Sequence, residues 1–170
     1  MINEAALGLM KEYSLAQEDV MHFHSGGARQ YENARGLFAA YGLERNDRLV
    51  LKEYIYDMPL HMAAADLVIC RAGAMTLTEL AMMGKPAILI PSPYVADNHQ
   101  YKNAKVLADR GAAILLEESE ITMEGLMEAA RSILEDPTRY AQMSAAVREF
   151  ADPMVEDKIY GEIEKLLNQR

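Results

Sequence analysis

The sequence predicts an α/β protein built on a doubly wound, parallel β-sheet. Short apolar runs alternate about five times with longer amphipathic segments along the 170 residues. Gly42, Gly84 and Gly111 each end one of the amphipathic segments, as is typical of helix C-termini. The unusual polar residues gather in the loops that follow the apolar runs, where ligands bind in such sheets.

Residues 3–13 carry an apolar helical face that includes Leu7, so we expect a helix there. An alternating run over 19–24 ends in a Ser-Gly-Gly loop and predicts a strand. The next helix is expected over 31–41, because a glycine follows it.

A second strand is expected over 48–55. Asp57 and a proline then open a short helix over 60–65. The apolar run 67–70 predicts a strand covered on both faces, and a helix over 76–83 follows it.

Residues 86–91 form a buried strand with a proline at each end, where proline is tolerated. Asp97 or Asn98 caps a helix that runs to Arg110. The last strand is expected over 112–116. The remaining predicted helices cover 123–134, 138–150 and 155–169.

Composition excludes several classes of protein. A net charge of −9 argues against nucleic acid as a partner. No run approaches the ~18 apolar residues of a membrane-spanning helix, and the N-terminal segment does not resemble a signal peptide. The single cysteine, Cys70, indicates a reducing cytoplasm. No His, Cys, Asp and Glu residues have metal-binding spacing, so we expect neither a metal nor a cofactor.

The chain starts with a helix, where a doubly wound sheet normally has a strand and a glycine-rich turn. We therefore expect that the first strand is missing and that the sequence is part of a longer protein.

The stretch around Gly73 has the strongest site signal. Small residues follow the strand, and the free N–H groups of the next helix favour an anion, above all phosphate. Glu79 lies one turn further on, off the packing stripe of Leu77 and Leu80, where its carboxylate could accept hydrogen bonds from sugar hydroxyls. The competing interpretation is a capping box between Thr76 and Glu79.

The loop over 92–100 is the second candidate. Gln100 is in helical register with Ala104, so its amide should point over the end of the sheet, towards sugar hydroxyls or into a loop-ordering hydrogen bond. His99 is either a base or a solvated side chain. Asn103 bonds either a ligand or the preceding loop.

Several motifs together resemble one family. They are Asp57-Met58, Arg71-Ala-Gly-Ala…Thr76-x-x-Glu79, Gly84-x-Pro86…Pro91 and Gln100-x-x-Asn103-Ala. This order is similar to the C-terminal, donor-binding half of the MurG family, within glycosyltransferase family 28. The family adds N-acetylglucosamine from UDP-GlcNAc to lipid I, which gives lipid II for peptidoglycan.

The resemblance implies the GT-B architecture, with two Rossmann-like domains and an inverting transfer without metal. Residues 1–170 would be the donor-binding domain, with a helical tail over 136–170. The implied substrate-binding residues are Asn3, Ile55, Gly73, Ala74, Met75, Thr76, Glu79, His99, Gln100 and Asn103.

The resemblance also implies roles. Backbone groups of residues 74–76 would hold the phosphate and sugar, Glu79 the ribose, and the backbone of Ile55 the uracil. Gln100, with His99 beside it, would contact the GlcNAc hydroxyls. His99 departs from the family pattern, in which a second glutamine is common.

The acceptor domain, which in the family contains the general base, is absent from this sequence. We therefore expect weak UDP-GlcNAc binding and no transfer by this chain alone. The whole protein would take lipid I through its other half, as a peripheral protein on the cytoplasmic face of the membrane. The alternatives are a subunit of a two-chain transferase, another UDP-sugar enzyme such as an epimerase or glycolipid synthase, and a noncatalytic nucleotide-binding module.

Overall fold

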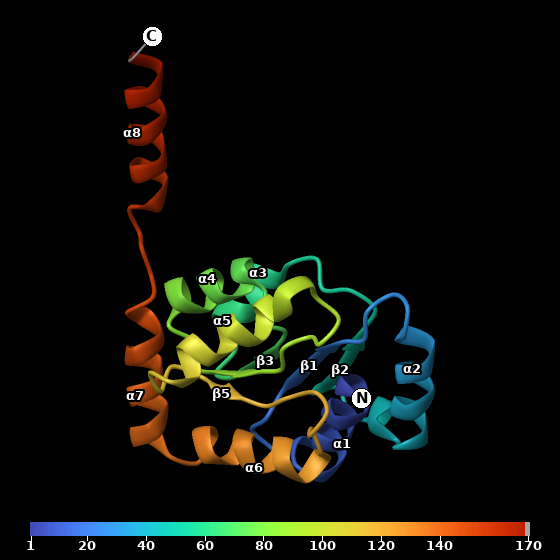
Figure 1. The fold of residues 1–170 in the computed structure, drawn as a ribbon. Helices are drawn as coiled ribbons and strands as arrows, with labels where there is room; N and C mark the ends of the chain where they lie inside the picture. The colour runs from blue at the N-terminus through green and yellow to red at the C-terminus, as the bar shows by residue number, and fades with distance from the viewer. Residues whose placement is uncertain (169–170) are drawn as a thin grey trace.

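The five strands form two parallel sheets in a computed structural model that describes residues 1–168. Strand β1 (His22–Ser25) pairs with β2 (Leu49–Lys52), with Phe23 opposite Val50. The other sheet has the order β3 (Val68–Cys70), β4 (Ala87–Leu89), β5 (Ile114–Leu115). The predicted α/β class with parallel strands is confirmed (Figure 1).

The described strands form two separate sheets and not one. β1 and β3 each use one edge for a partner, and no strand among the described residues pairs with their other edges. The sheets are therefore separated between β1 and β3.

The helices follow the predicted order. They are α1 (Ile2–Glu12), α2 (Tyr31–Ala40), α3 (Met58–Ala64), α4 (Ala74–Met83), α5 (His99–Ala108), α6 (Met123–Leu134), α7 (Pro137–Arg148) and α8 (Val155–Asn168). Single 3₁₀ turns occupy Ser14–Ala16, Leu43–Arg45 and Ala96–Asn98. The strands are shorter than predicted; β2, for example, ends at Lys52, well before residue 55. Gln169, the predicted end of the last helix, lies outside the described residues.

The three-stranded sheet is covered on both faces. Leu89 packs with residues of α4, α5 and α7, whereas its neighbours Ile88 and Ile90 pack with residues of α1 and α6. All three side chains are fully buried. Because successive strand side chains point to opposite faces, a strand between two helical layers must be apolar throughout. This explains the continuous apolar run of β4.

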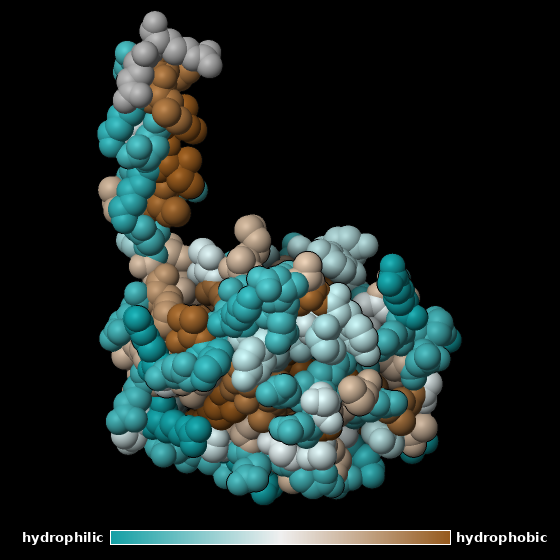
Figure 2. Space-filling view, in the orientation of Figure 1, coloured by the Kyte–Doolittle hydropathy of each residue, from teal (hydrophilic) through white to brown (hydrophobic). Residues whose placement is uncertain are grey.

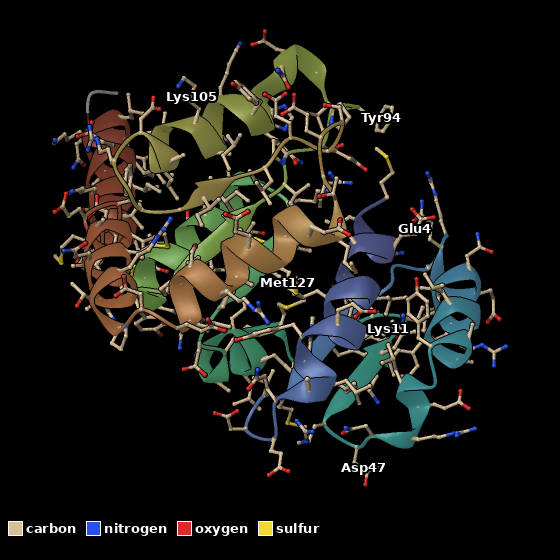
Figure 3. The ribbon with its side chains drawn as sticks, turned by 90° about the horizontal axis from the view of Figure 1, so that it is seen from below. Glu4, Lys11, Asp47, Tyr94, Lys105 and Met127 are labelled. Atoms are coloured by element: carbon tan, nitrogen blue, oxygen red, sulfur yellow. The ribbon has the colours of Figure 1, made fainter. Side chains whose placement is uncertain are left out.

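The two-stranded sheet shares α1 with the larger one. Leu7 and Met10 of α1 pack with Phe38 of α2 and with Leu49 of β2. They also pack with Leu43, in the 3₁₀ turn between α2 and β2. Helix α1 also contacts α6, so it lies between α6 and α2 (Figure 3). It thereby connects the cores beneath the two sheets.

Helix α8 extends away from this body (Figure 1). None of its residues is buried, and apolar side chains that include Ile159, Ile163 and Leu166 gather along one side of it (Figure 2). No described helix is long and apolar enough to cross a lipid bilayer.

Candidate functional site

The turn from β3 into α4 is the centre of the candidate site. Cys70 ends β3, Ala72 is fully buried, and Gly73 is the N-cap residue with φ −71° and ψ 143°. Helix α4 begins at Ala74, whereas the sequence predicted its start at Thr76. The capping-box interpretation is therefore wrong, because Thr76 lies inside the first turn and no side chain caps this helix.

The first amides of α4 are free. Leu77 N–H makes the first intrahelical bond, to the Gly73 carbonyl at 3.0 Å. The amides of Ala74, Met75 and Thr76 have no acceptor within residues 1–168. Ala74 and Met75 are exposed. Unpaired amides at the positive end of a helix dipole attract an anion, so this end of α4 has the chemistry of a phosphate site.

Glu79 lies one turn further along α4. It is partly exposed, and the described residues include no hydrogen-bond or ion-pair partner for its carboxylate. Burial, together with the negative charge of Glu79, raises the pKa of the Cys70 thiol to about 12. The carboxylate is thus near the end of β3 and free to accept hydroxyl donors, and Cys70 stays a protonated thiol at neutral pH.

Gln100 stands at the start of α5, above the end of β4. Its Oε1 accepts a hydrogen bond from Ser92 N–H at 2.9 Å, so the amide orders its own loop. Its Nε2 has no partner among the described residues and can donate to a ligand. The neighbouring His99 is exposed, with Nδ1 2.9 Å from the Ala96 carbonyl.

The backbone before α5 is unusual. Asp97 and Asn98 have φ of 54° and 49°, in the left-handed region that non-glycine residues rarely adopt. Asn98 is the N-cap residue, but its side chain makes no capping bond, and the prediction of a side-chain cap is wrong. Backbone strain of this kind tends to occur at functional sites.

Asn103 connects the two candidate loops. Its Nδ2 donates to the Ala72 carbonyl at 3.4 Å, so it bonds the turn after β3 instead of the loop before α5. Asn103 and Ala74 also line one groove between α4 and α5, together with Leu77 and Val106. The structure thus brings Asn103 beside the N-terminus of α4.

Ile55 lies in the loop between β2 and α3. Its side chain is buried, whereas Tyr54 and Tyr56 on either side are exposed. In the part of the chain that the structure describes, its backbone N–H and carbonyl form no hydrogen bond. These groups remain available to a ligand.

Asn3 is engaged inside the protein. Its Nδ2 donates to the Gly26 carbonyl at 2.9 Å and lies 3.3 Å from Gln30 Oε1, and its Oδ1 is 2.9 Å from His24 Nε2. Burial lowers the pKa of His24 to about 4, so the ring is neutral at pH 7 and donates through Nε2–H. Asn3 holds the loop after β1 and has little capacity left for a ligand.

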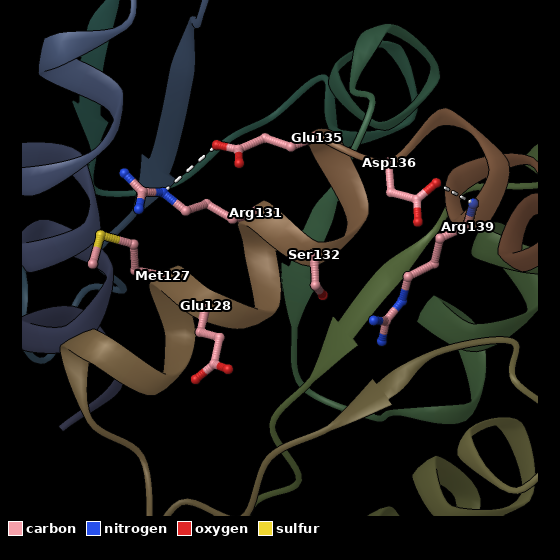
Figure 4. Close-up of a pocket in the computed structure, with 7 residues that line it drawn as sticks. All are labelled: Met127, Glu128, Arg131, Ser132, Glu135, Asp136 and Arg139. Carbon is pink, nitrogen blue, oxygen red and sulfur yellow. Dashed lines mark hydrogen bonds and ion pairs between the residues drawn. The ribbon is translucent and has the colours of Figure 1, made fainter.

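Another surface pocket lies elsewhere (Figure 4). It is lined by Met127, Glu128, Arg131, Ser132, Glu135, Asp136 and Arg139. These residues belong to α6 and its junction with α7, and none of the predicted site residues lines this pocket. Within residues 1–168 no group of three or more His, Cys, Asp or Glu residues is arranged to hold a metal ion.

Residues 1–158 match the family described as the glycosyltransferase family 28 C-terminal domain. The chain belongs to glycosyltransferase family 28. Two relatives are named UDP-N-acetylglucosamine--N-acetylmuramyl-(pentapeptide) pyrophosphoryl-undecaprenol N-acetylglucosamine transferase. That of Desulforamulus reducens is 37% identical over 168 residues, which are 98% of this chain and 45% of the relative. That of an Anaeromyxobacter species (strain Fw109-5) is 41% identical over 147 residues, 86% and 38% of the respective chains. The family 28 chain therefore spans less than half the length of these relatives.

Solved structures agree with this assignment. The crystal structure of Acinetobacter baumannii MurG is 33% identical, with a TM-score of 0.76 over 96% of this chain and 46% of that chain. A UDP-N-acetylglucosamine 2-epimerase has a TM-score of 0.73 over 98% of this chain and 42% of that chain, at 18% identity. The second similarity shows the fold alone. The expected Rossmann-like fold is thus confirmed for this family 28 domain.

Sequence reasoning missed one ion pair at the site. Arg71 Nη1 lies 2.7 Å from Glu118 Oε2, and the hydrogen bond from Arg71 lowers the pKa of the Glu118 carboxyl. Arg71 directly follows β3, and Glu118 follows β5 after a few residues. Because each residue follows a strand, the sequence placed both at the carboxyl ends of strands. Only the strand order of the sheet shows that they lie close together.

Proposed function

We propose that this chain is the donor-binding half of an inverting transferase that moves N-acetylglucosamine from UDP-GlcNAc to lipid I, forming lipid II. The observation that carries the proposal is the N-terminus of α4. It presents three free amides, those of residues 74–76, with the unpartnered carboxylate of Glu79 one turn away. In a family 28 chain, this pairing suits the diphosphate and the ribose of a uridine nucleotide.

The donor fits these groups in order. The free amides of α4 hold the diphosphate, since the helix dipole favours negative charge there. Glu79 accepts hydrogen bonds from the ribose hydroxyls, and the free backbone groups of Ile55 face the uracil. Gln100 donates through Nε2 to the sugar, with His99 beside it. Asn3 acts one step away, because its amide is occupied by the loop after β1.

This half contributes to the reaction by positioning and charge stabilisation. Negative charge builds on the diphosphate as its bond to the sugar breaks, and fixed amides stabilise it without reorganising. The general base and the lipid I site belong to the remaining length of the relatives. The full-length protein is accordingly a UDP-GlcNAc-dependent transferase at the cytoplasmic membrane face, and the isolated chain does not transfer sugar.

The substitution Glu79→Ala tests this assignment. It should weaken UDP binding by roughly 1–3 kcal/mol, as expected for losing hydrogen bonds to a charged group. That corresponds to a roughly 5- to 150-fold rise in the dissociation constant measured by titration calorimetry. Glu128→Ala, on the outer face of α6, is the matched control and should leave the affinity unchanged. An unaltered affinity in the Glu79 variant would contradict the ribose contact.

Ligand-observed NMR tests the choice of donor. UDP-GlcNAc should bind in preference to UDP-glucose, UDP-galactose and ADP. Preferential binding of ADP would overturn the proposal. Formation of lipid II by the isolated chain would contradict the assignment of the base to another half.

A further inference from the structure

Arg71 joins the ends of all three strands in the larger sheet. It directly follows β3, and its Nη1 lies 3.2 Å from the Ile90 carbonyl and 3.3 Å from the Pro91 carbonyl, just beyond β4. The same nitrogen lies 2.7 Å from Glu118 Oε2, in the loop after β5. A single guanidinium therefore fixes the separation of three strand ends.

Glu118 holds the guanidinium in place. Its side chain is only 10% exposed, and Arg71 is its ion-pair partner. A carboxylate so little exposed needs such a partner, since water no longer solvates it fully. Most other ion pairs in the described residues join exposed side chains and are worth little.

The loop that Arg71 fixes carries Gln100. Pro91 is followed by Ser92, whose N–H bonds Gln100 Oε1 at 2.9 Å. The bond sequence therefore runs from Arg71 through the end of β4 to the amide of Gln100. Asn103 returns to the Ala72 carbonyl, so the turn before α4 and the start of α5 are linked at two points.

We propose that Arg71, held by Glu118, is a positioning residue that sets Gln100 at the correct distance from the N-terminus of α4. This inference rests on the proposed function and deepens it. The α4 amides hold the diphosphate and Gln100 holds the sugar. Arg71 therefore connects the two segments that contact these two parts of the ligand. Without the connection, the sugar contact is lost while the diphosphate contact remains.

The test compares Arg71→Met and Glu118→Gln with the unaltered chain. Titration calorimetry gives the affinity for UDP and for UDP-GlcNAc. The affinity gained from the sugar is the ratio of the UDP dissociation constant to the UDP-GlcNAc dissociation constant. We expect this ratio to fall about fivefold or more, while the UDP dissociation constant changes less than about twofold. A role in folding alone would weaken both ligands equally or neither, and either result overturns the proposal.

Arg48→Met is the matched control. Arg48 also donates from Nη1 to two backbone carbonyls, those of Gln17 and Val20, but it lies outside the proposed site. This variant should lower the melting temperature without altering the gain from the sugar. If it reduced that gain as much as Arg71→Met does, the positioning role would be wrong.

A ligand-free readout separates the two proposals. Amide hydrogen exchange at Ser92 N–H should become faster in Arg71→Met and in Glu118→Gln, because the bond to Gln100 loosens. Unchanged exchange in both folded variants overturns the positioning role, even if UDP-GlcNAc binds. Failure of the unaltered chain to bind UDP-GlcNAc overturns the proposed function, and with it a role for Arg71 towards the donor.

Discussion

Two pairs of helices in this chain begin in opposite ways. Helices α4 and α5 begin at the candidate site, and no side chain caps either of them. Helices α6 and α7 begin with Thr122 and Asp136, whose side chains accept hydrogen bonds from the first-turn amides. Asp136 accepts two such bonds, at 2.9 and 3.0 Å, and Thr122 accepts one at 3.0 Å.

A missing cap does not mark a site by itself, since α1, α2 and α3 also lack a capping side chain. A capping side chain contributes about 1 kcal/mol to stability, so a helix without one gives up that contribution. At α4 the free amides remain available to an anion, which can serve as the cap when it binds. The capped helices have only a structural role in this interpretation.

Giving α4 a cap of its own should have the largest effect. In Gly73→Asp, the new carboxylate would bond the amides of Met75 and Thr76 and repel the diphosphate. We expect UDP affinity to fall tenfold or more, with a gain of a few tenths of a kcal/mol in unfolding free energy. Calorimetric titration and urea unfolding measure the two effects.

Gly73→Ala is the control for this substitution. A Cβ built at Gly73 meets no atom within 4 Å, and the backbone there is extended, so alanine fits without strain. It adds a side chain without a charge and should reduce UDP affinity less than the aspartate does. If the aspartate variant binds UDP as tightly as the alanine variant does, the amides of α4 are not the phosphate site.

Removing the cap of α7 should have a smaller effect, on stability alone. Asp136→Ala leaves the amides of Thr138 and Arg139 without their acceptor and should cost about 1 kcal/mol of unfolding free energy. UDP affinity should not change. Asp136→Asn keeps an acceptor and should restore most of the loss. A fall in UDP affinity would show that α7 is not separate from the site.

Removing the cap of α6 should have the smallest effect. Thr122 accepts one bond, from Gly125 N–H, and carries no charge, so Thr122→Ala should cost about 0.5 kcal/mol. Thr122→Ser keeps the hydroxyl and serves as the control. Equal losses for the alanine variants of Thr122 and Asp136 would contradict the order proposed here. Chemical denaturation gives both values.

Sequence patterns predicted much of the candidate site. The turn at Gly73 and the position of Glu79 off the packing stripe followed from small residues and helical periodicity. The start of α4 was misplaced, because Thr76-x-x-Glu79 has the pattern of a capping box whether or not the helix begins there. For Asn3 the resemblance implied a ligand contact, which stays a prediction; in the structure its amide bonds His24 and Gly26.

The sequence by itself determined the α/β class, the order of the elements and the family, because periodicity and motifs are local properties of the chain. Only the tertiary structure decided that the strands form two sheets and that α4 lacks a cap. It also joined Arg71 to Glu118, which are far apart in the chain. Such contacts depend on which strands lie side by side, and local residue patterns do not specify that.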